Sequence, residues 1–493
     1  MASSATAADP ATLPPAPPSK ADSEAGADRR AHHVETPAEK TWSPEAERRL
    51  IRKVDWHLLP AVWLMCLVSW TDRSNIGNAK IAGMTSDLAM SSPEYSLSIV
   101  VFYVGYAVWV PISNMLLVRS RPSVFLPSIM LLWGVGTCSM AAVATYPQLL
   151  AVRTLVGFFE AGLTPGVVLL ISSWYVPAEQ AKRAAAYVSA ALLGGAFGGL
   201  VAGAVTGGLE GAHGIRGWRW LFIVEGVVTI AWALASLFLL PDFPDNCQWL
   251  DADERAMAVA RLVRASVRVR GTDSGRPRLG KMRSLVLALS DWRVWGLTLA
   301  SAMLGCAMVL SYFYPTFVKQ MGYTSTVESQ YMTAPIWAAA FGCALLSGFG
   351  GDRVPRQRAL VIAAWMGISA MMAILMCVDY DFQARYALLV IMAGGVWSGI
   401  AMSIAFATTT FADLAPEVRA VAIAFPGSAT NLGNIYGAYL FPQAGAPKYL
   451  LGFGVVSATL GTGSVLYATL YLVLRRQKTR RDAEGVPETD SGG

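Results

Sequence analysis

The sequence has few charged residues for its length, and this shortage excludes most soluble folds. Charged side chains make up 15% of the 493 residues, whereas hydrophobic side chains make up 54%. A soluble domain usually carries about 25% charged residues. The length alone would suit about three soluble domains, but the apolar residues are gathered in long blocks. The composition therefore indicates an integral membrane protein.

The chain also lacks the residue groups that most enzymes use. Its four histidines, His32, His33, His57 and His213, fall outside the apolar blocks, and no glycine-rich phosphate-binding loop occurs. The usual metal and general-base groupings are therefore missing, and so is the loop that ATP-driven proteins need. We expect a protein that is not an enzyme, with no cofactor, no metal site and no direct coupling to ATP.

Cysteine pairs and a signal peptide are missing as well. The six cysteines form no CxxC pair and five of them lie in apolar blocks, where thiols behave as small hydrophobic side chains. Residues 1–43 are rich in Ala, Pro and Ser and have no apolar core. We expect no disulfide framework and a disordered N-terminal tail.

Twelve apolar blocks are long enough to cross a bilayer as helices. A hydrocarbon core about 30 Å thick needs about 20 apolar residues per helix, and the blocks are too evenly apolar for the alternating strands of a membrane barrel. The prediction is an all-α polytopic membrane protein with twelve transmembrane helices. The expected spans are 58–80, 95–118, 123–145, 148–172, 184–208, 218–240, 292–317, 329–350, 359–378, 385–410, 420–442 and 449–474.

A single long gap divides these spans into six and six. It begins after Pro241, ends before Trp292, and contains a charged stretch with helical spacing of its apolar residues. Two six-helix bundles are the pattern expected of transporters built from repeated halves. The predicted domains are an N-terminal tail (1–43), a first bundle (44–241), a cytoplasmic linker (242–291), a second bundle (292–474) and a C-terminal tail (475–493).

The positive charges predict the orientation. With both termini in the cytoplasm, thirty Lys and Arg residues fall in the termini and inner loops, and six fall in the outer loops. This asymmetry is the one that cytoplasmic loops show. The net charge of +6 therefore reflects topology, and no nucleic-acid partner is expected.

A loop after the eighth predicted span carries a family motif. It has Gly348, Asp352, Arg353 and Arg356 at the motif spacing, with Pro355 where glycine is usual. The loop resembles the hallmark loop of the major facilitator superfamily, and the resemblance implies that Asp352, Arg353 and Arg356 belong to a gating loop. The matching loop after the second span keeps only the arginine, at position 119.

A second resemblance is carried by the polar stretch 72–83 in the first span, which reads DRSNIGNAKIAG. It looks like the first-helix signature of the anion:cation symporters within this superfamily, especially the fungal allantoate permease branch. The resemblance implies uptake of a small organic anion, such as allantoate, nicotinate, pantothenate, biotin or tartrate, together with protons. Other matching stretches are 110–114, 159–162, 165–166, 217–222 and 241–244.

Asp72 and Arg73 place two charges where hydrocarbon would normally surround the chain, and such residues usually mark a transport pathway. Adjacent residues point about 100° apart on a helix, so each needs a partner on another helix. Arg153 and Glu160 of the fourth span are seven residues apart, share a helix face and lie at matching depths. We expect an Asp72–Arg153 contact and an Arg73–Glu160 contact.

These four residues suggest a chemistry. One or both arginines can hold a substrate carboxylate in a charge-assisted grip. Glu160 is the preferred proton carrier because deep burial disfavours a charged carboxylate. A purely structural salt-bridge network is the alternative.

Other polar residues extend the candidate site. Asn75 and Asn78 follow Asp72 at three-residue intervals and share one broad helix face with it, although amides also serve helix packing. The second half offers four further polar candidates, for which packing is an equal alternative. They are Tyr312, Tyr314, Asn431 and Asn434.

Two further groups are interpreted as structural. Asp87 and Glu225 lie near predicted span ends, where water lowers the cost of a charge, and we assign them no substrate role. Gly195, Gly199 and Gly203 form a small-residue row in the fifth span, which should let helices approach closely.

Together these features favour a secondary transporter that imports a small organic anion with protons by alternating access. The expected setting is the plasma membrane, with the protein as a monomer in the lipid bilayer. The alternatives are an exporter of a fungal secondary metabolite and a nutrient sensor that does not transport.

Overall fold

The protein is an all-helical membrane protein. The computed structural model describes residues 42–247, 249–265, 280–323, 325–354, 357–378 and 381–483, and no β-strand occurs among them. Ten helices in this part of the chain are long and apolar enough to cross a membrane. The first and eleventh predicted spans coincide with α2 and α18, whose polar residues make them less hydropathic. The predicted all-α fold is confirmed.

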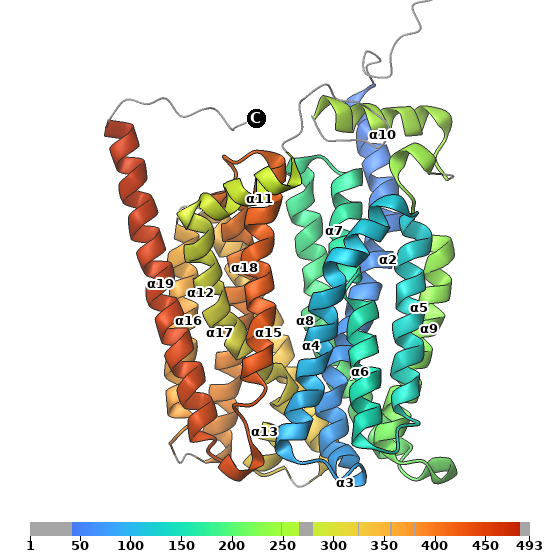
Figure 1. The fold of residues 1–493 in the computed structure, drawn as a ribbon, viewed down its shortest axis with the longest axis vertical. Helices are drawn as coiled ribbons and strands as arrows, with labels where there is room; N and C mark the ends of the chain where they lie inside the picture. The colour runs from blue at the N-terminus through green and yellow to red at the C-terminus, as the bar shows by residue number, and fades with distance from the viewer. Residues whose placement is uncertain are drawn as a thin grey trace, which may run out of the picture.

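The first half contains the first six predicted spans (Figure 1). The fourth span is divided between two helices, α6 and α7. The elements are α2 (Pro44–Ala79), η1 (Lys80–Met84), α3 (Thr85–Asp87), α4 (Ser92–Arg119), α5 (Pro122–Met140), α6 (Tyr146–Glu160), α7 (Leu163–Trp174), α8 (Pro177–Gly208), η2 (Ala212–Gly214) and α9 (Gly217–Leu239).

Two linker helices and the second half follow. The linker holds η3 (Pro244–Asn246), α10 (Ala252–Arg264) and α11 (Lys281–Ser290). The second half contains α12 (Trp292–Met308), η4 (Val309–Tyr312), α13 (Tyr314–Met321), α14 (Thr326–Tyr331), α15 (Thr333–Arg353), α16 (Arg358–Leu375), α17 (Phe382–Thr410), α18 (Pro416–Gly437), η6 (Gln443–Gly445) and α19 (Leu450–Ala483).

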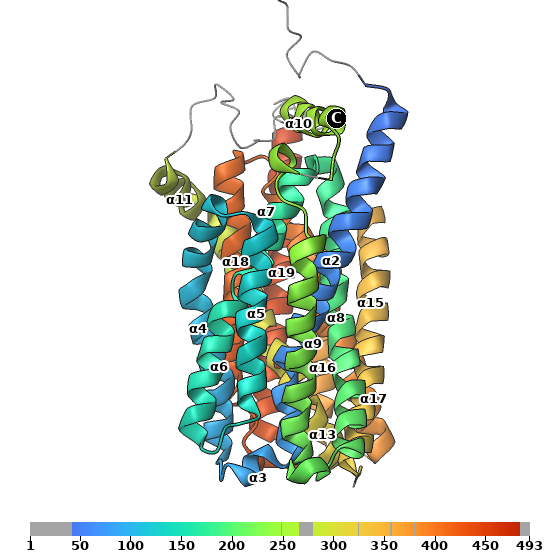
Figure 2. The same ribbon diagram turned by 90° about the vertical axis from the view of Figure 1, so that its right-hand side faces the viewer.

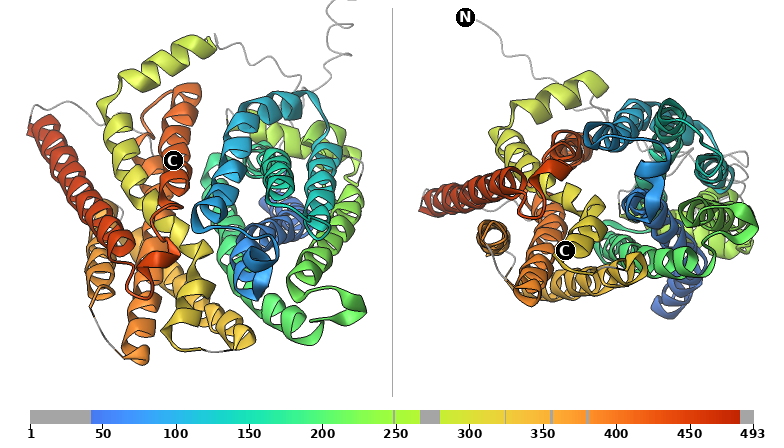
Figure 3. Two further views of the ribbon diagram at one scale, coloured as in Figure 1. Left: turned by 60° about the horizontal axis from the view of Figure 1, so that its bottom comes forward. Right: turned by 90° about the horizontal axis from the view of Figure 1, so that it is seen from below.

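The two halves stand side by side as separate bundles, which Figure 3 shows along and near the bundle axis. The helices α10 and α11 lie at one end, which we call the linker end, and α3 and α13 lie at the other, which we call the far end (Figure 1). Figure 2 shows that α2 extends past its neighbours at the linker end. The division into two bundles agrees with the sequence prediction.

Local sequence signals set the helix starts. The Ser43 hydroxyl accepts a hydrogen bond from the Ala46 amide at 3.2 Å and caps α2. Ser91 and Glu94 form a capping box at the start of α4. These caps satisfy amide groups that the first helical turn leaves without partners.

Three predicted spans are broken in their interior. The fourth is interrupted between α6 and α7, the seventh tightens to the 3-10 helix η4 before α13, and the eighth is interrupted between α14 and α15. The first predicted span, 58–80, ends where α2 changes to the π-helix η1, in which Gly83 has a φ of 103°. Such irregular turns often accompany functional sites, and two of these breaks directly follow Glu160 and Met308.

Hydrogen bonds between described residues of the two halves lie toward the far end. Ser96 of α4 donates to the Ala438 carbonyl at 2.7 Å, and Lys319 of α13 donates to the Ile81 carbonyl at 3.0 Å. In a third hydrogen bond, the Thr206 hydroxyl of α8 donates to Gln330 Oε1 of α14 at 2.6 Å. The two bundles are thus held together at this end.

The glycine row of α8 lies between the two halves, as its small size requires. A side chain at Gly195 would collide with Trp337 of α15, and one at Gly203 would collide with Tyr331 of α14. The interleaved Gly194 instead lies against the main chain of Leu67 in α2. The prediction that these glycines serve close helix packing is confirmed.

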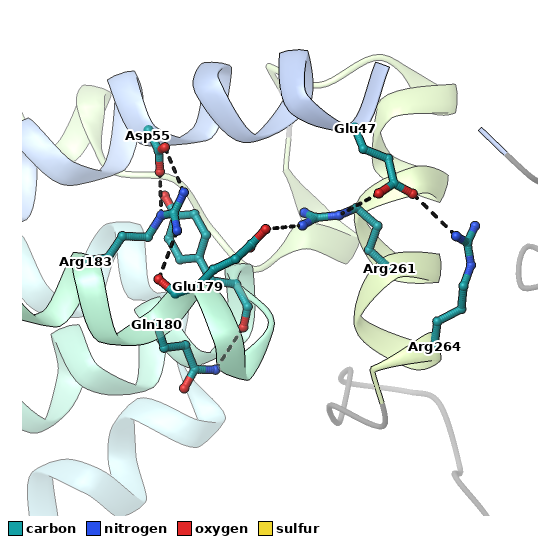
Figure 4. Close-up of polar contacts among 8 residues, drawn as sticks. Glu47, Asp55, Glu179, Gln180, Arg183, Arg261 and Arg264 are labelled. Atoms are coloured by element: carbon teal, nitrogen blue, oxygen red, sulfur yellow. Dashed lines mark hydrogen bonds and ion pairs between the residues drawn. The ribbon is translucent and has the colours of Figure 1, made fainter. Parts of the chain in front are cut away.

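At the linker end, α10 is fastened to the first half by ion pairs (Figure 4). Arg261 of α10 contacts Glu179 of α8 at 2.7 Å and Glu47 of α2 at 3.7 Å. Next to it, Arg183 of α8 holds both carboxylate oxygens of Asp55 at 2.7 and 2.8 Å. These contacts link the ends of α2, α8 and α10.

Candidate transport site

Arg73 and Glu160 form an ion pair inside the first half. The Arg73 Nη2 and Nε atoms donate to Glu160 Oε1 at 2.7 and 3.1 Å. The Ser69 hydroxyl, one turn earlier on α2, donates to the same oxygen at 2.5 Å. Glu160 is 1% exposed and Arg73 is 5% exposed. The predicted Arg73–Glu160 contact is therefore confirmed.

Aromatic rings surround the Arg73 guanidinium. Its Cζ atom lies 4.9 Å from the Trp70 ring centroid, 5.1 Å from that of Phe102 and 5.3 Å from that of Tyr106. Rings at this distance attract a cation through their electron-rich faces. They also present flat apolar surface beside the charged groups.

Arg153 of α6 is a fully buried cation whose terminal nitrogens lack protein partners. Its exposed fraction is 0%, and its Nη1 and Nη2 atoms make no hydrogen bond with any described residue. The Nε atom makes a long contact of 3.5 Å with the Ser98 carbonyl, and Cζ lies 5.0 Å from the Phe102 centroid. Two strong donor groups are left available for an anion.

Asp72 does not contact Arg153, so that prediction was wrong. Its Oδ2 atom accepts hydrogen bonds from Trp133 Nε1 of α5 at 3.2 Å and from the Thr229 hydroxyl of α9 at 2.8 Å. The physical reason is the direction in which each side chain leaves α2. Arg73 points toward α6, and its neighbour Asp72, about 100° away, faces α5 and α9 instead.

Glu225 of α9 was also misjudged. It is 4% exposed, and neither of its carboxyl oxygens has a hydrogen-bond partner among the described residues. The residue lies eight positions after the start of α9 at Gly217, which is roughly 12 Å along the helix. The signal that could have revealed it is a lone acid within an otherwise apolar span.

Asn75 and Asn78 lie together at the interface with α8. The Asn78 amide donates to Asn75 Oδ1 at 2.9 Å and makes a long contact of 3.5 Å with the Gly198 carbonyl. The Asn78 carbonyl accepts from Gln330 Nε2 of the second half at 3.4 Å. These contacts serve helix packing, while Asn75 Nδ2 and Asn78 Oδ1 keep no partner among the described residues.

Tyr312 is the second-half candidate that the structure brings to the charged cluster. Its hydroxyl lies 2.8 Å from the Tyr103 hydroxyl of α4, and its carbonyl accepts from Tyr95 at 3.3 Å. The break at η4 thus places Tyr312 against the first half.

The other second-half candidates lie apart. Tyr314 packs edge-on against Trp337, with centroids 5.6 Å apart. Among the described residues, the Asn431 amide donates within its own helix, to the Gly427 carbonyl at 3.3 Å. Asn434 is buried and its amide faces the Met308 sulfur at 3.7 Å. A substrate role for Asn431 remains a prediction.

The predicted gating loop is described only in part. Arg353 is exposed and donates to the Phe349 carbonyl at 3.2 Å. Asp352 belongs to the last turn of α15, but its side chain lies outside the described part, as does the whole of Arg356. Their gating role stays a prediction.

Comparison with known proteins identifies the family. The model of the Major Facilitator Superfamily matches residues 62–438. The MFS-type transporter cnsO of Penicillium expansum is 32% identical over 456 residues, which cover 90% of this chain and 86% of that protein. The MFS transporter prlL of a fungal species (strain NRRL 50135) is 33% identical over 464 residues, 91% of each chain.

Solved structures show the same fold at low sequence identity. An inward-facing, occupied bacterial homolog of the human lysosomal transporter Spinster has a TM-score of 0.63 and 17% identity, covering 88% of this chain and 98% of that one. A D-xylose-proton symporter has a TM-score of 0.65 and 14% identity, covering 83% and 96%. The chain therefore belongs to the major facilitator superfamily, a family of membrane transporters.

Proposed function

We propose that the protein is a secondary active transporter that moves a small organic anion together with a proton by alternating access. The observation that carries this proposal is Arg153, a buried cation whose two terminal nitrogens have no hydrogen-bond partner among the described residues. A buried charge is costly unless it is paired. A substrate carboxylate would supply that pair through two parallel hydrogen bonds, which is the geometry that guanidinium groups favour.

Neighbouring charges explain why Arg153 is the available cation. Arg73 is already neutralised by Glu160 at 2.7 Å. Asp72 does not contact Arg153, because the Oδ2 atom of Asp72 accepts hydrogen bonds from Trp133 and Thr229 instead. The donors of Arg153 therefore remain open to an anion, and the nearby Phe102 ring offers apolar contact to its carbon skeleton.

Glu160 is the proposed proton carrier. Its Oε1 atom accepts the hydrogen bonds from Ser69 and Arg73, while its Oε2 atom is buried with no partner in the described part of the chain. A proton on Glu160 would weaken its hold on Arg73 and leave that guanidinium to share the anion. Proton and anion would then enter the site as a neutral pair, which lowers the cost of crossing the bilayer.

The setting follows the charge pattern of the loops. We place the linker end and both termini in the cytoplasm, because thirty Lys and Arg residues fall on that side against six on the other. The far-end contacts then close the outer side of the protein. The plasma membrane, a monomeric state and a carboxylate of the allantoate, nicotinate, pantothenate or tartrate kind complete the proposal.

The test is uptake of a panel of labelled carboxylates, vitamins and ureides into cells that express the protein, at acidic and neutral external pH. Uptake of one anion should rise at acidic pH. Arg153→Gln should lower it by about tenfold or more, since a hydrogen bond to a charged group contributes about 1.5–3 kcal/mol. Arg49→Gln, which removes an exposed charge at the linker end, is the control and should retain uptake.

Glu160→Gln provides the second arm of this experiment. The amide mimics the protonated acid, so anion exchange across the membrane should continue while the dependence of uptake on external pH disappears. Unchanged pH dependence would refute the role of Glu160, and unchanged uptake in Arg153→Gln would refute the anion site. Transport that runs only outward would instead favour the exporter alternative.

A further inference from the structure

Glu225 is an acidic residue that the proposed anion site does not use. It lies in the interior of α9, is 4% exposed, and has no hydrogen-bond partner for either carboxyl oxygen among the described residues. An ionised carboxylate in such a place bears the full cost of desolvation. The neutral, protonated form avoids that cost, but its O–H group still needs an acceptor.

The candidate acceptor is Asp72 of α2. Glu225 lies one turn before Thr229 on the same face of α9, the Thr229 hydroxyl bonds Asp72, and Asp72 Oδ1 is itself buried without a donor among the described residues. The Thr229 hydroxyl connects the two residues, because it lies 2.8 Å from Asp72 Oδ2 and 2.9 Å from the main-chain carbonyl of Glu225. That hydroxyl has one hydrogen and can serve only one of the two oxygens at a time.

A second hydroxyl occurs at the same level of the bundle. Thr137 of α5 is 0% exposed and its Oγ1 atom has no partner among the described residues. Because α5 runs toward the far end and α9 runs away from it, Thr137 and Glu225 each lie one turn on the far-end side of Trp133 and Thr229, the two donors to Asp72. Thr137 and Glu225 are thus at one level of the neighbouring helices α5 and α9, next to the two donors that hold Asp72.

The cluster of Asp72 and Glu225 has two acidic groups and no basic group in contact with them among the described residues. No Lys or Arg forms an ion pair with Asp72 or Glu225 in the described part of the chain. Arg153 and Glu160 of α6 act on Asp72 from a distance, and the Cys138 thiol of α5 also interacts with it. Two neighbouring buried carboxyl groups with no contacting cation cannot both be ionised, so they hold a proton between them.

We propose that Asp72 and Glu225 form a second proton-binding site, separate from the Arg73–Glu160 pair, with Thr137 and Thr229 as its hydroxyl ligands. A proton from water binds to one carboxylate and leaves again as a proton, and no other bond changes. The role of this site in coupling rests on the proposed proton-linked transport. Its existence does not, because the site holds its proton without substrate.

Infrared difference spectroscopy of the full chain in lipid vesicles tests the site without any substrate. Spectra recorded during a pH titration separate protonated carboxyl groups from carboxylates. Glu225→Gln should remove one buried protonated-carboxyl band, and Asp72→Asn should shift that band because its partner has changed. Thr137→Val should also shift it. Glu328→Gln, an exposed acid of α14, should leave it unchanged.

Several outcomes would overturn the proposal. The band could persist in both Glu225→Gln and Asp72→Asn, or it could respond to sodium ions at fixed pH, which would make the cluster a metal-cation site. Circular dichroism of each variant confirms that the protein is folded, and Glu225→Asp, which keeps a carboxyl group, should restore a band.

A transport measurement separates this proposal from the anion proposal. If anion uptake is found, Glu225→Gln should shift its pH profile by about one pH unit or more while uptake itself continues. Arg153→Gln should lower uptake by about tenfold or more and keep the infrared band. Loss of the band in Arg153→Gln, or an unshifted pH profile in Glu225→Gln, would contradict a separate proton site.

Discussion

Single residues determine the charge balance inside the first half, and Arg73 with Glu160 is the pair most sensitive to substitution. Removing one partner of a buried ion pair costs about 3–5 kcal/mol, because the other charge is left uncompensated. We expect Arg73→Gln to lower the melting temperature of the purified protein clearly at neutral pH.

The double variant Arg73→Gln/Glu160→Gln is the control for this prediction. It removes both charges, so it should be more stable than Arg73→Gln alone. Melting curves of the wild type and the three variants at neutral pH complete the cycle. Equal stability of the single and double variants would show that the pair does not stabilise the fold.

This pair could be predicted from the sequence because it depends only on the depth of each residue in the membrane and on the sign of its charge. Arg73 and Glu160 lie at computable depths on two helices, and a buried charge must find an opposite one. The partners of Asp72 could not be predicted in the same way. Trp133 and Thr229 are ordinary residues of apolar helices, and only the lateral arrangement of α5 and α9 brings them to the carboxylate.

The burial of Glu225 also could not be predicted from the sequence. The predicted span 218–240 and α9 (Gly217–Leu239) begin within one residue of each other, so the predicted boundary was accurate. The wrong step was to treat an acid seven residues inside that span as solvated. The sequence does not show that the surrounding helices α2 and α5 cover this part of α9 and keep water away.

At the scale of helices, glycines set the distance between α12 and α18. Gly305 lies against the main chain of Thr430, and Gly433 lies against the main chain of Gly305. A methyl group at Gly433 has no room unless the helices move apart, and overpacking of this kind costs about 1–3 kcal/mol. We expect Gly433→Ala to lower the melting temperature and transport activity together.

Gly427 of the same helix is the matched control. A side chain there would meet no atom within 4 Å, and alanine is a better helix former than glycine by about 1 kcal/mol. Gly427→Ala should therefore be neutral or stabilising in the same thermal measurement. If both alanine variants behave alike, the close packing of α12 and α18 does not limit stability.

Helix breaks were the elements that the sequence did not predict. The twelve apolar blocks indicated continuous spans, whereas the structure interrupts the fourth, seventh and eighth of them and continues the first into a π-helix. Gly83, with its positive φ, marks the end of η1, but glycines are frequent in every span of this protein. Composition alone cannot distinguish a glycine that packs a helix from one that ends it.

At the scale of the whole molecule, α10 joins the linker to the first half through contacts that respond to pH. Burial acts to raise the pKa of Glu254, but hydrogen bonds from Lys53 Nζ and the Asp251 amide outweigh it and hold the pKa below the usual 4.5. The Lys53–Glu254 distance is 2.6 Å. A depressed pKa stabilises the folded state above the usual value, and this stabilisation is lost as the pH falls through the lowered one.

Glu254→Gln should accordingly reduce stability at neutral pH by about 0.2–1 kcal/mol, the range for exposed ion pairs. The difference from the wild type should vanish as the pH falls well below 4.5. Thermal melting across this pH range measures it, with Glu45→Gln, an exposed acid of α2, as the control. A difference that persists at acidic pH would contradict the assignment.

Four of the hydrogen bonds that close the far end use main-chain oxygens as acceptors, at Ile81, Asn78, Tyr312 and Ala438, and the Thr206 bond uses a neutral amide oxygen. The linker end is fastened by pairs of opposite charges. Dissolved salt screens exposed charge pairs within a Debye length of about 8–10 Å but has little effect on bonds to neutral carbonyls. Changes in ionic strength therefore act on the two ends of the molecule unequally, loosening the docking of α10 while leaving the seal between the bundles intact.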